Sequence, residues 1–387
     1  MSLVAGLVVV RSIPFVDHSR RVRAGMLVVP FDRWGDRVRG LAGHTVWWGG
    51  GMPCDAQGGA LSRVVAREDA RDLGDGVVVS HLMCNRPPDR EFHDHHELVS
   101  AYVALISGYA MVLDPAATAR GSRGAIPVED RDTPFRYMDT ASARAGVVGL
   151  NAKLHGSRIG IVGLGGTGSY VLDLVAKTPV GAIHLYDGDL FEQHSAFRFP
   201  GAASREDIDA GRAKVDHFAA VYSNMHTRIF PHRTRIDRHN LGLPDPVDFV
   251  FLCIDEGGAK QPIVERLERD GKSYIDCGIG VVFDRHGLMG ALRTTTSTPA
   301  MRDHVRDKER IPFVGGGGEP DAYSSNIQIA DLNALNAALA VLRWKRLCGF
   351  YADGGGEHHS VFVVDSNQII NADRAEPAVV GRSCERS

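Results

Sequence analysis

The residues with the clearest chemical purpose are four closely spaced glycines in the middle of the chain. They follow the pattern G-x-G-G-x-G and are Gly163, Gly165, Gly166 and Gly168. An apolar run at 159–162 precedes them and predicts a buried strand, and a helical pattern follows at about 167–177. Glycines let the backbone approach a phosphate, which the N–H groups and dipole of the following helix then bind. This stretch therefore predicts a nucleotide-binding turn.

An acidic pair closes the next apolar run. The run at 182–186 predicts a second strand and is followed by Asp187-Gly188-Asp189. In βαβ nucleotide-binding units, an acid at the end of the second strand binds the ribose. Asp187 occupies that position, and strand, helix, second strand and terminal acid together indicate nucleotide binding more strongly than the glycines alone.

Further downstream, charged residues suited to a triphosphate follow other predicted elements. Arg198 comes after the acidic pair, Lys214 opens a helical pattern, and Asp255 ends the apolar run 249–254. The carboxyl ends of parallel strands meet at one edge of a sheet, so we expect these side chains to converge there. The cations suit polyphosphate, and Asp255 suits the magnesium ion that ATP carries. A redox enzyme with the same glycine turn needs no such set.

Composition excludes several classes of protein. The chain has 387 residues, 44% of them hydrophobic and 24% charged, with a formal net charge of −3. This charge gives no reason to expect nucleic-acid or membrane binding, and no apolar run approaches the roughly 20 residues of a membrane span. The N-terminal stretch lacks a basic leader. The six cysteines form no CxxC pair, so we expect neither a disulfide framework nor a cysteine zinc site, and a reducing cytoplasm fits best.

The chain divides into four segments by composition. Residues 1–115 predict a small α+β domain, with strands at 7–10, 26–29, 45–48 and 77–79 and a helix at 95–111. Residues 116–135 look like a linker. Residues 136–374 form the predicted nucleotide domain, which begins with a polar helix at 137–154. Residues 375–387 look like a frayed tail.

The residues from about 135 to 370 resemble the ThiF/MoeB/HesA family of ubiquitin-activating-enzyme-like adenylyltransferases. The resemblance implies a Rossmann-like α/β domain with a mainly parallel sheet, and Mg-ATP-dependent adenylation of the C-terminal glycine carboxylate of a ubiquitin-like or sulfur-carrier protein. By position, the four glycines would bind the nucleotide, Asp187 the ribose and Asp255 the Mg²⁺. Asp189, Arg198 and Lys214 would lie at the phosphates.

The chain departs from the family at three places. Ser195 stands where the family motif has an asparagine ahead of the arginine, and we expect it to contact the phosphates. Only Arg136 and Arg144 represent the usual arginine-rich segment before the glycine strand. The crossover segment 290–305 has no cysteine, which leaves Cys277 as the nearest candidate nucleophile, although a strand-end cysteine is more often a small core residue. The alternatives are that the chemistry ends at the acyl-adenylate or that it passes to a cysteine on another domain or protein.

The first 115 residues resemble an accessory domain found ahead of bacterial ThiF-like modules. His44 stands ten residues before Cys54, a spacing seen in ubiquitin-conjugating domains, but such a spacing also arises by chance among 17 histidines and six cysteines. A cluster around the start of the predicted helix could bind a metal or simply cap the helix, and we favour capping. Its members are His81, Cys84, His93, Asp94, His95 and His96. His358 and His359 are expected in a loop.

Three functions compete at this point. The adenylating enzyme is favoured over an NAD-dependent oxidoreductase, because the set of Arg198, Lys214 and Asp255 has no use in hydride transfer. A non-enzymatic scaffold with the same fold is the third. The apolar helical stretch at about 331–347 is either a central buried helix or part of a homodimer interface.

Overall fold

The chain folds as two compact units, Met1–Lys153 and Leu154–Ser387. The computed structural model describes residues 1–31, 33–34, 37–38, 40–41, 43–87, 90–119, 133–242, 246–255, 257–313 and 327–375. Most of the predicted linker at 116–135 and nearly all of the predicted tail at 375–387 lie outside the described residues.

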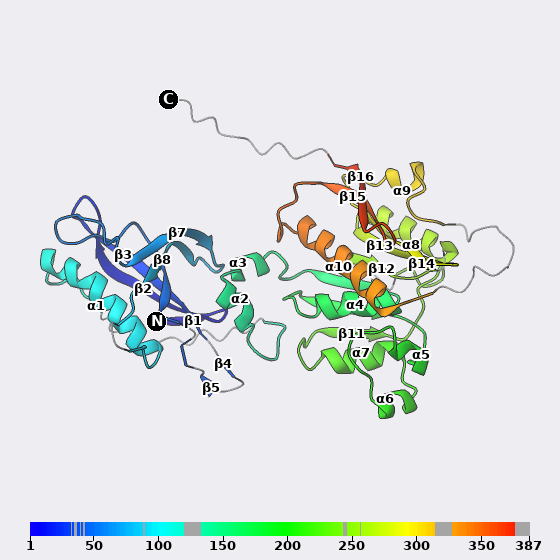
Figure 1. The fold of residues 1–387 in the computed structure, drawn as a ribbon, viewed down its shortest axis with the longest axis horizontal. Coiled ribbons are helices and arrows are strands. Elements are labelled where there is room, and N and C mark those ends of the chain that lie inside the picture. The colour runs from blue at the N-terminus through cyan, green and yellow to red at the C-terminus, as the bar shows by residue number, and fades with distance from the viewer. Residues whose placement is uncertain are drawn as a thin grey trace. The chain divides into compact units, whose positions relative to one another are not determined.

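The first unit is built on an antiparallel sheet with the strand order β1-β2-β3-β6-β8-β7 (Figure 1). Its strands are β1 (Ser2–Val4), β2 (Leu7–Val16), β3 (Val22–Pro30), β6 (Thr45–Gly49), β7 (Val65–Asp72) and β8 (Val78–Cys84). Two short strands, β4 (Arg33–Trp34) and β5 (Arg37–Val38), pair separately. The predicted strands at 7–10, 26–29 and 45–48 all lie within these elements, whereas β1 and the polar β7 have no apolar run that predicts them.

One long helix, α1 (His95–Leu113), covers one face of this sheet. Leu98, Tyr102 and Ile106 on the helix pack with residues of β2 and β3 in one apolar cluster. Among the described residues, α1 is the one helix long and apolar enough to cross a membrane by length and composition, a test that the core helix of a soluble protein also passes. Helix α1 confirms the predicted helix at 95–111.

The predicted helix at 137–154 is wrong as one continuous element. The structure has two short helices instead, α2 (Thr140–Ala145) and α3 (Val148–Asn151), separated at Gly146, whose φ of 67° is left-handed. Ala143 of α2 packs in the second apolar cluster of the first unit. Both helices therefore belong to that unit, whose end at Lys153 lies beyond the boundary at 136 that we expected.

The second unit contains an eight-stranded sheet with the order β11-β10-β9-β12-β13-β14-β15-β16. The first five strands are parallel and the last three pair antiparallel. The parallel strands are β9 (Arg158–Val162), β10 (Ala182–Tyr186), β11 (Ile229–His232), β12 (Phe249–Leu252) and β13 (Ser273–Asp284). The antiparallel extension consists of β14 (Gly287–Ser297), β15 (Glu357–Val363) and β16 (Gln368–Arg374).

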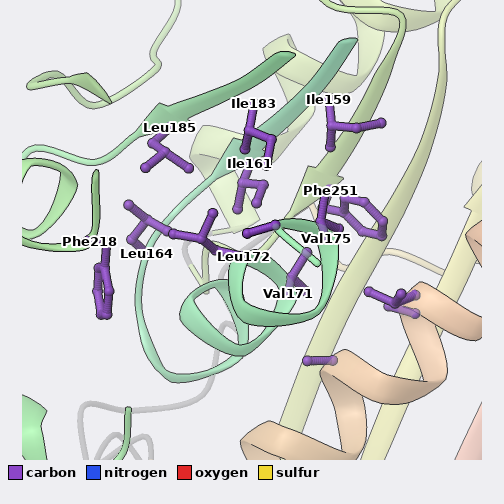
Figure 2. Close-up of a cluster of buried hydrophobic side chains, with 14 of the residues drawn as sticks. Ile159, Ile161, Leu164, Val171, Leu172, Val175, Ile183, Leu185, Phe218 and Phe251 are labelled. Atoms are coloured by element: carbon purple, nitrogen blue, oxygen red, sulfur yellow. The ribbon is translucent and has the colours of Figure 1, made fainter. Parts of the chain in front are cut away.

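Helices cover both faces of this sheet (Figure 1). The longer ones are α4 (Gly166–Val175), α7 (Lys214–Tyr222), α8 (Gly257–Arg269) and α10 (Ala330–Leu347), and the short ones are α5 (Gln193–Ala196), α6 (Arg205–Asp209) and α9 (His304–Asp307). Ile159 and Ile161 of β9 face α4, as Figure 2 shows, in a cluster that α7 and α10 also join. Val162 faces the opposite cluster, to which α8 contributes. This arrangement confirms the predicted Rossmann-like α/β fold preceded by a smaller sheet domain.

Two local predictions for this unit need comment. His358 and His359 lie in β15 and are buried, so the predicted loop there is wrong. Helix α10 buries Ala337, Ala340 and Trp344 in the core, as a central helix does, while its place in a homodimer interface stays a prediction.

Candidate functional site

A cavity of about 790 Å³ opens at the carboxyl ends of β9, β10 and β12. β10 pairs with one side of β9 and β12 with the other, so chain connections diverge at this point, which is where open α/β sheets bind ligands. The lining includes these residues with chemically useful groups: Gly163, Gly165, Asp187, Asp189, Arg198, Lys214, Arg235, Arg238, Asp255 and Gln328. The volume lies within the range of small-molecule and cofactor sites.

The glycine turn leaves no room for other residues at its ends. Gly163 has a φ of 88°, and a Cβ there would lie 2.7 Å from the Cys253 carbonyl oxygen. A Cβ on Gly168 would lie 1.9 Å from the Gly163 carbonyl oxygen, and one on Gly166 would overlap the Asn333 amide. At Gly165 the nearest neighbour would be 3.9 Å away. The turn is thus packed on the protein side and open on the cavity side at Gly165.

Asp187 is a buried carboxylate that holds this turn. Its Oδ2 accepts a hydrogen bond of 2.7 Å from the backbone N–H of Leu164, and its Oδ1 accepts one of 2.8 Å from that of Asp189. Each carboxylate oxygen can accept a second hydrogen bond. Asp187 can therefore shape the turn and still accept from a ligand hydroxyl.

Lys214, Asp189 and Arg235 form an ion network on the cavity wall. The Lys214 ammonium, which is 5% exposed, donates to Asp189 Oδ2 at 2.8 Å and lies 3.9 Å from Asp187 Oδ1. The Arg235 guanidinium donates to the other oxygen of Asp189. Burial alone would raise the pKa of Asp189, but the hydrogen bonds from Lys214 and Arg235 outweigh it and lower that pKa to about 2. The wall carries two cations and one firmly ionised carboxylate.

Arg198 supplies a third cation to the cavity. Its guanidinium lies over the Phe199 ring at 5.8 Å. Within the described part of the chain, its buried Nε finds no hydrogen-bond partner, and no ion pair to a carboxylate is present. A buried N–H without a partner is costly. An anionic ligand in the cavity would satisfy it.

Asp255 stands across the cavity at the end of β12. Burial among protein atoms raises its pKa, while the charges of Lys260 and Arg198 oppose that rise. Its Oδ2 accepts a hydrogen bond of 2.9 Å from the side-chain amide of Gln328. A carboxylate in this setting favours a cation as a neighbour.

Four predicted site residues do not line the cavity: Gly166 and Gly168, which pack on the protein side of the turn, and Ser195 and Cys277. Ser195 is fully buried in α5, and its hydroxyl lies 3.5 Å from His194 Nε2. Cys277 is 3% exposed and packs in the core cluster. Its thiol lies beside that of Cys253, whose pKa is raised by their contact and by burial. Because its thiol is buried, Cys277 cannot contact the C-terminus of a carrier protein in this structure. This does not fit the nucleophile role for which it was a candidate.

The candidate acceptor cysteine and metal ligand of the first unit have structural roles instead. Cys54 is 2% exposed, and burial raises the pKa of its thiol, which is the opposite of what an acceptor cysteine needs. Asp94 caps α1 by accepting from the Glu97 backbone N–H at 2.8 Å, as the capping interpretation predicts. No group of three or more metal-ligating side chains occurs among the described residues.

Sequence reasoning missed several polar residues that line the cavity, Arg235, Arg238 and Gln328 among them. Arg235 and Arg238 follow β11 in a segment without any motif, and Gln328 precedes α10. Two arginines shortly after a parallel strand were a usable signal, because the carboxyl ends of such strands face the ligand. No sequence signal distinguishes Gln328 from an ordinary polar residue before a helix.

Both parts of the chain match known family models. Residues 138–313 match the ThiF family, which confirms the predicted resemblance, and residues 1–140 match a domain of unknown function (DUF6791). Ubiquitin-like modifier-activating enzyme 5 of Dictyostelium discoideum is 25% identical over 150 residues, or 36% of this chain and 39% of that protein. The Rattus norvegicus enzyme is 27% identical over 163 residues, or 39% of this chain and 40% of that protein.

The match thus spans about two fifths of these curated relatives. Among solved structures, E. coli MccB with ATP aligns over 62% of this chain and 72% of that chain, with 17% identity and a TM-score of 0.45.

Proposed function

We propose that this chain, whose residues 138–313 form a ThiF family domain, uses Mg-ATP to adenylate the C-terminal carboxylate of a small carrier protein. The observation that carries the proposal is the single cavity at the strand ends, which collects the glycine turn, Asp187, Lys214, Arg198 and Asp255. Four cationic side chains line the cavity (Arg198, Lys214, Arg235 and Arg238), more than the pyrophosphate of a nicotinamide cofactor needs. A triphosphate does need them, because its charge must be balanced on several sides.

The residues present fit ATP and its magnesium ion as substrate. The open side of the glycine turn would take phosphate oxygens, and Asp187 would accept from the ribose. Asp255, whose pKa is raised by burial, fits a divalent cation, since a cation beside it would favour its ionised form. When bound there, Mg²⁺ would neutralise charge on the phosphates.

The reaction needs positioning and charge rather than a protein nucleophile. A carboxylate oxygen of the carrier attacks the α-phosphorus and forms a new P–O bond, and the bond from that phosphorus to the β-phosphate oxygen breaks. The electron pair leaves with pyrophosphate, whose developing charge Lys214 and Arg198 stabilise. No proton has to move, because the carboxylate is already ionised near neutral pH.

The partner we propose is a ubiquitin-like or sulfur-carrier protein with a C-terminal glycine, and a homodimer remains our expectation for the assembly. The names of the ubiquitin-like modifier-activating relatives support this class of partner. Cys54 and Cys277 are both buried, so we propose that this chain carries the chemistry as far as the acyl-adenylate.

The test is exchange of labelled pyrophosphate into ATP, with a small ubiquitin-like protein that ends in Gly-Gly. We expect exchange with the free carboxylate and none with the same carrier amidated at its C-terminus. Asp255→Asn should lower the rate on the order of a hundredfold or more. Asp365→Asn, in the exposed turn after β15, is the matched control and should leave the rate unchanged. Full exchange by Asp255→Asn would show that the site is assigned wrongly.

A further inference from the structure

Gln328 reaches into the cavity from the segment just before α10. It lines the cavity, and its side chain is half-buried. The carboxamide contacts two groups that lie on different elements of the sheet unit. Its Nε2 donates to Asp255 Oδ2 at 2.9 Å, and its Oε1 accepts from the backbone N–H of Gly166 at 3.2 Å.

These two groups are the ones that the proposed substrate requires. The N–H of Gly166 lies in the first turn of α4, where it has no partner within the helix and where a phosphate oxygen would bind. Asp255 is the acid that would face the cation. The carboxamide oxygen thus stands where an anionic oxygen would accept, and the carboxamide NH₂ stands where a positive charge would lie.

Neighbouring contacts hold the carboxamide in this position. Asn333, one turn into α10 and fully buried, accepts a hydrogen bond of 3.1 Å from the Thr167 hydroxyl. Its side chain also packs against Gly166, so that a Cβ there would meet it. The start of α10 is therefore fixed against the glycine turn, which places Gln328 within reach of both partners before any ligand arrives and lowers the entropic cost of its two contacts.

We propose that Gln328 is a latch on the nucleotide site, which Mg-ATP must release by replacing the carboxamide at Gly166 and at Asp255. The proposal rests on the proposed function, because it concerns the same cavity. A phosphate oxygen would accept from the Gly166 N–H, and the cation would bind the Asp255 carboxylate. ATP without Mg²⁺ therefore replaces the carboxamide at Gly166 only, whereas Mg-ATP replaces it at both groups. The latch makes tight binding depend on the complete Mg-ATP complex.

The experiment measures the Kd of ATP with Mg²⁺ and with EDTA by calorimetry, for wild type and for Gln328→Met. Methionine keeps the length of the side chain but can form neither contact. We expect Gln328→Met to bind ATP in EDTA about tenfold more tightly than wild type, since hydrogen bonds of this kind compete on that scale. The gain with Mg²⁺ should be smaller, because magnesium already helps to open the wild-type latch.

A second variant and a control keep the result clear. Gln328→Ala should show the same direction of change, and its melting temperature checks that the fold persists. Gln368→Ala, on the exposed strand β16, should bind like wild type.

Equal or weaker binding by both Gln328 variants would overturn the latch while the proposed function stood. If neither wild type nor variants bound ATP in either condition, both the latch and the proposed function would fall. Binding only after Gln328 is replaced would support both.

Discussion

The two units of this protein place their chemically reactive side chains in very different surroundings. In the first unit, Cys54 and Asp94 have spacings that suggest chemistry, yet one is sealed in the interior and the other caps a helix. In the second unit, Asp187 and Lys214 come from separate elements and meet at one cavity. The difference is topological. Parallel strands with crossover helices deliver their ends to a common edge, whereas the antiparallel strands of the first sheet run in alternating directions.

The two units also differ in whether their reactive atoms are available to a ligand. Burial raises the pKa of the Cys54 thiol and leaves it unreactive. Around the cavity, the Nε of Arg198 is without a partner among the described residues, and Gly165 has open space in front of it. A ligand-binding site needs side chains that meet at one place and hydrogen-bonding groups that are available to the ligand.

The largest effect should follow removal of the buried cation at the cavity. Lys214→Met keeps most of the side-chain volume but leaves Asp189 with Arg235 alone. We expect the pyrophosphate exchange rate to fall on the order of a hundredfold to a thousandfold, because charge on the leaving group loses its stabilisation. Lys177→Met removes a lysine that pairs with Asp173 on the surface of the second unit and serves as control. A loss of less than threefold in Lys214→Met would place the phosphates elsewhere.

A smaller effect is expected from removal of the two buried thiols, one in each unit. Cys54→Ala and Cys277→Ala should each lose about 1 kcal/mol of unfolding free energy, as small core truncations do, with an unchanged exchange rate. Unfolding in urea and intact-mass analysis without reductant provide the measurements, with the half-buried Cys84→Ala as control. A carrier adduct that reductant removes, and that one of the two substitutions abolishes, would restore a thioester role.

The sequence was informative where structure is local. The strand–turn–helix–strand stretch around Gly163 could be predicted because its apolar runs, glycines and Asp187 follow one another within one βαβ unit. Cys277 was expected at the end of its strand, but β13 continues to Asp284, because its second half is stabilised by pairing with β14, a contact that no periodicity reveals. The break at Gly146 also depends on packing within the first unit, where Ala143 of α2 lies in an apolar cluster.

Within the site, the same limit applies to single residues. Lys214 and Asp255 could be placed because Lys214 begins a recognisable helix and Asp255 follows a recognisable strand. Arg235 was not predicted because its importance depends on its ion pair with Asp189. Gln328 was not predicted because its two partners lie in α4 and in the segment after β12. Ser195 was expected at the phosphates because it stands where the family motif has an asparagine, but in α5 its side chain is buried in the interior.

The most direct test of the central claim is the choice of nucleotide, measured as the shift in melting temperature of the wild-type chain. A ligand that binds the folded state at about 100 times its Kd stabilises it by about 2.7 kcal/mol, which is readily detected. The account predicts a clear shift with Mg-ATP, a smaller one with ATP in EDTA, and none with NADH. A shift with NADH and none with Mg-ATP would contradict it and make the cavity a nicotinamide site.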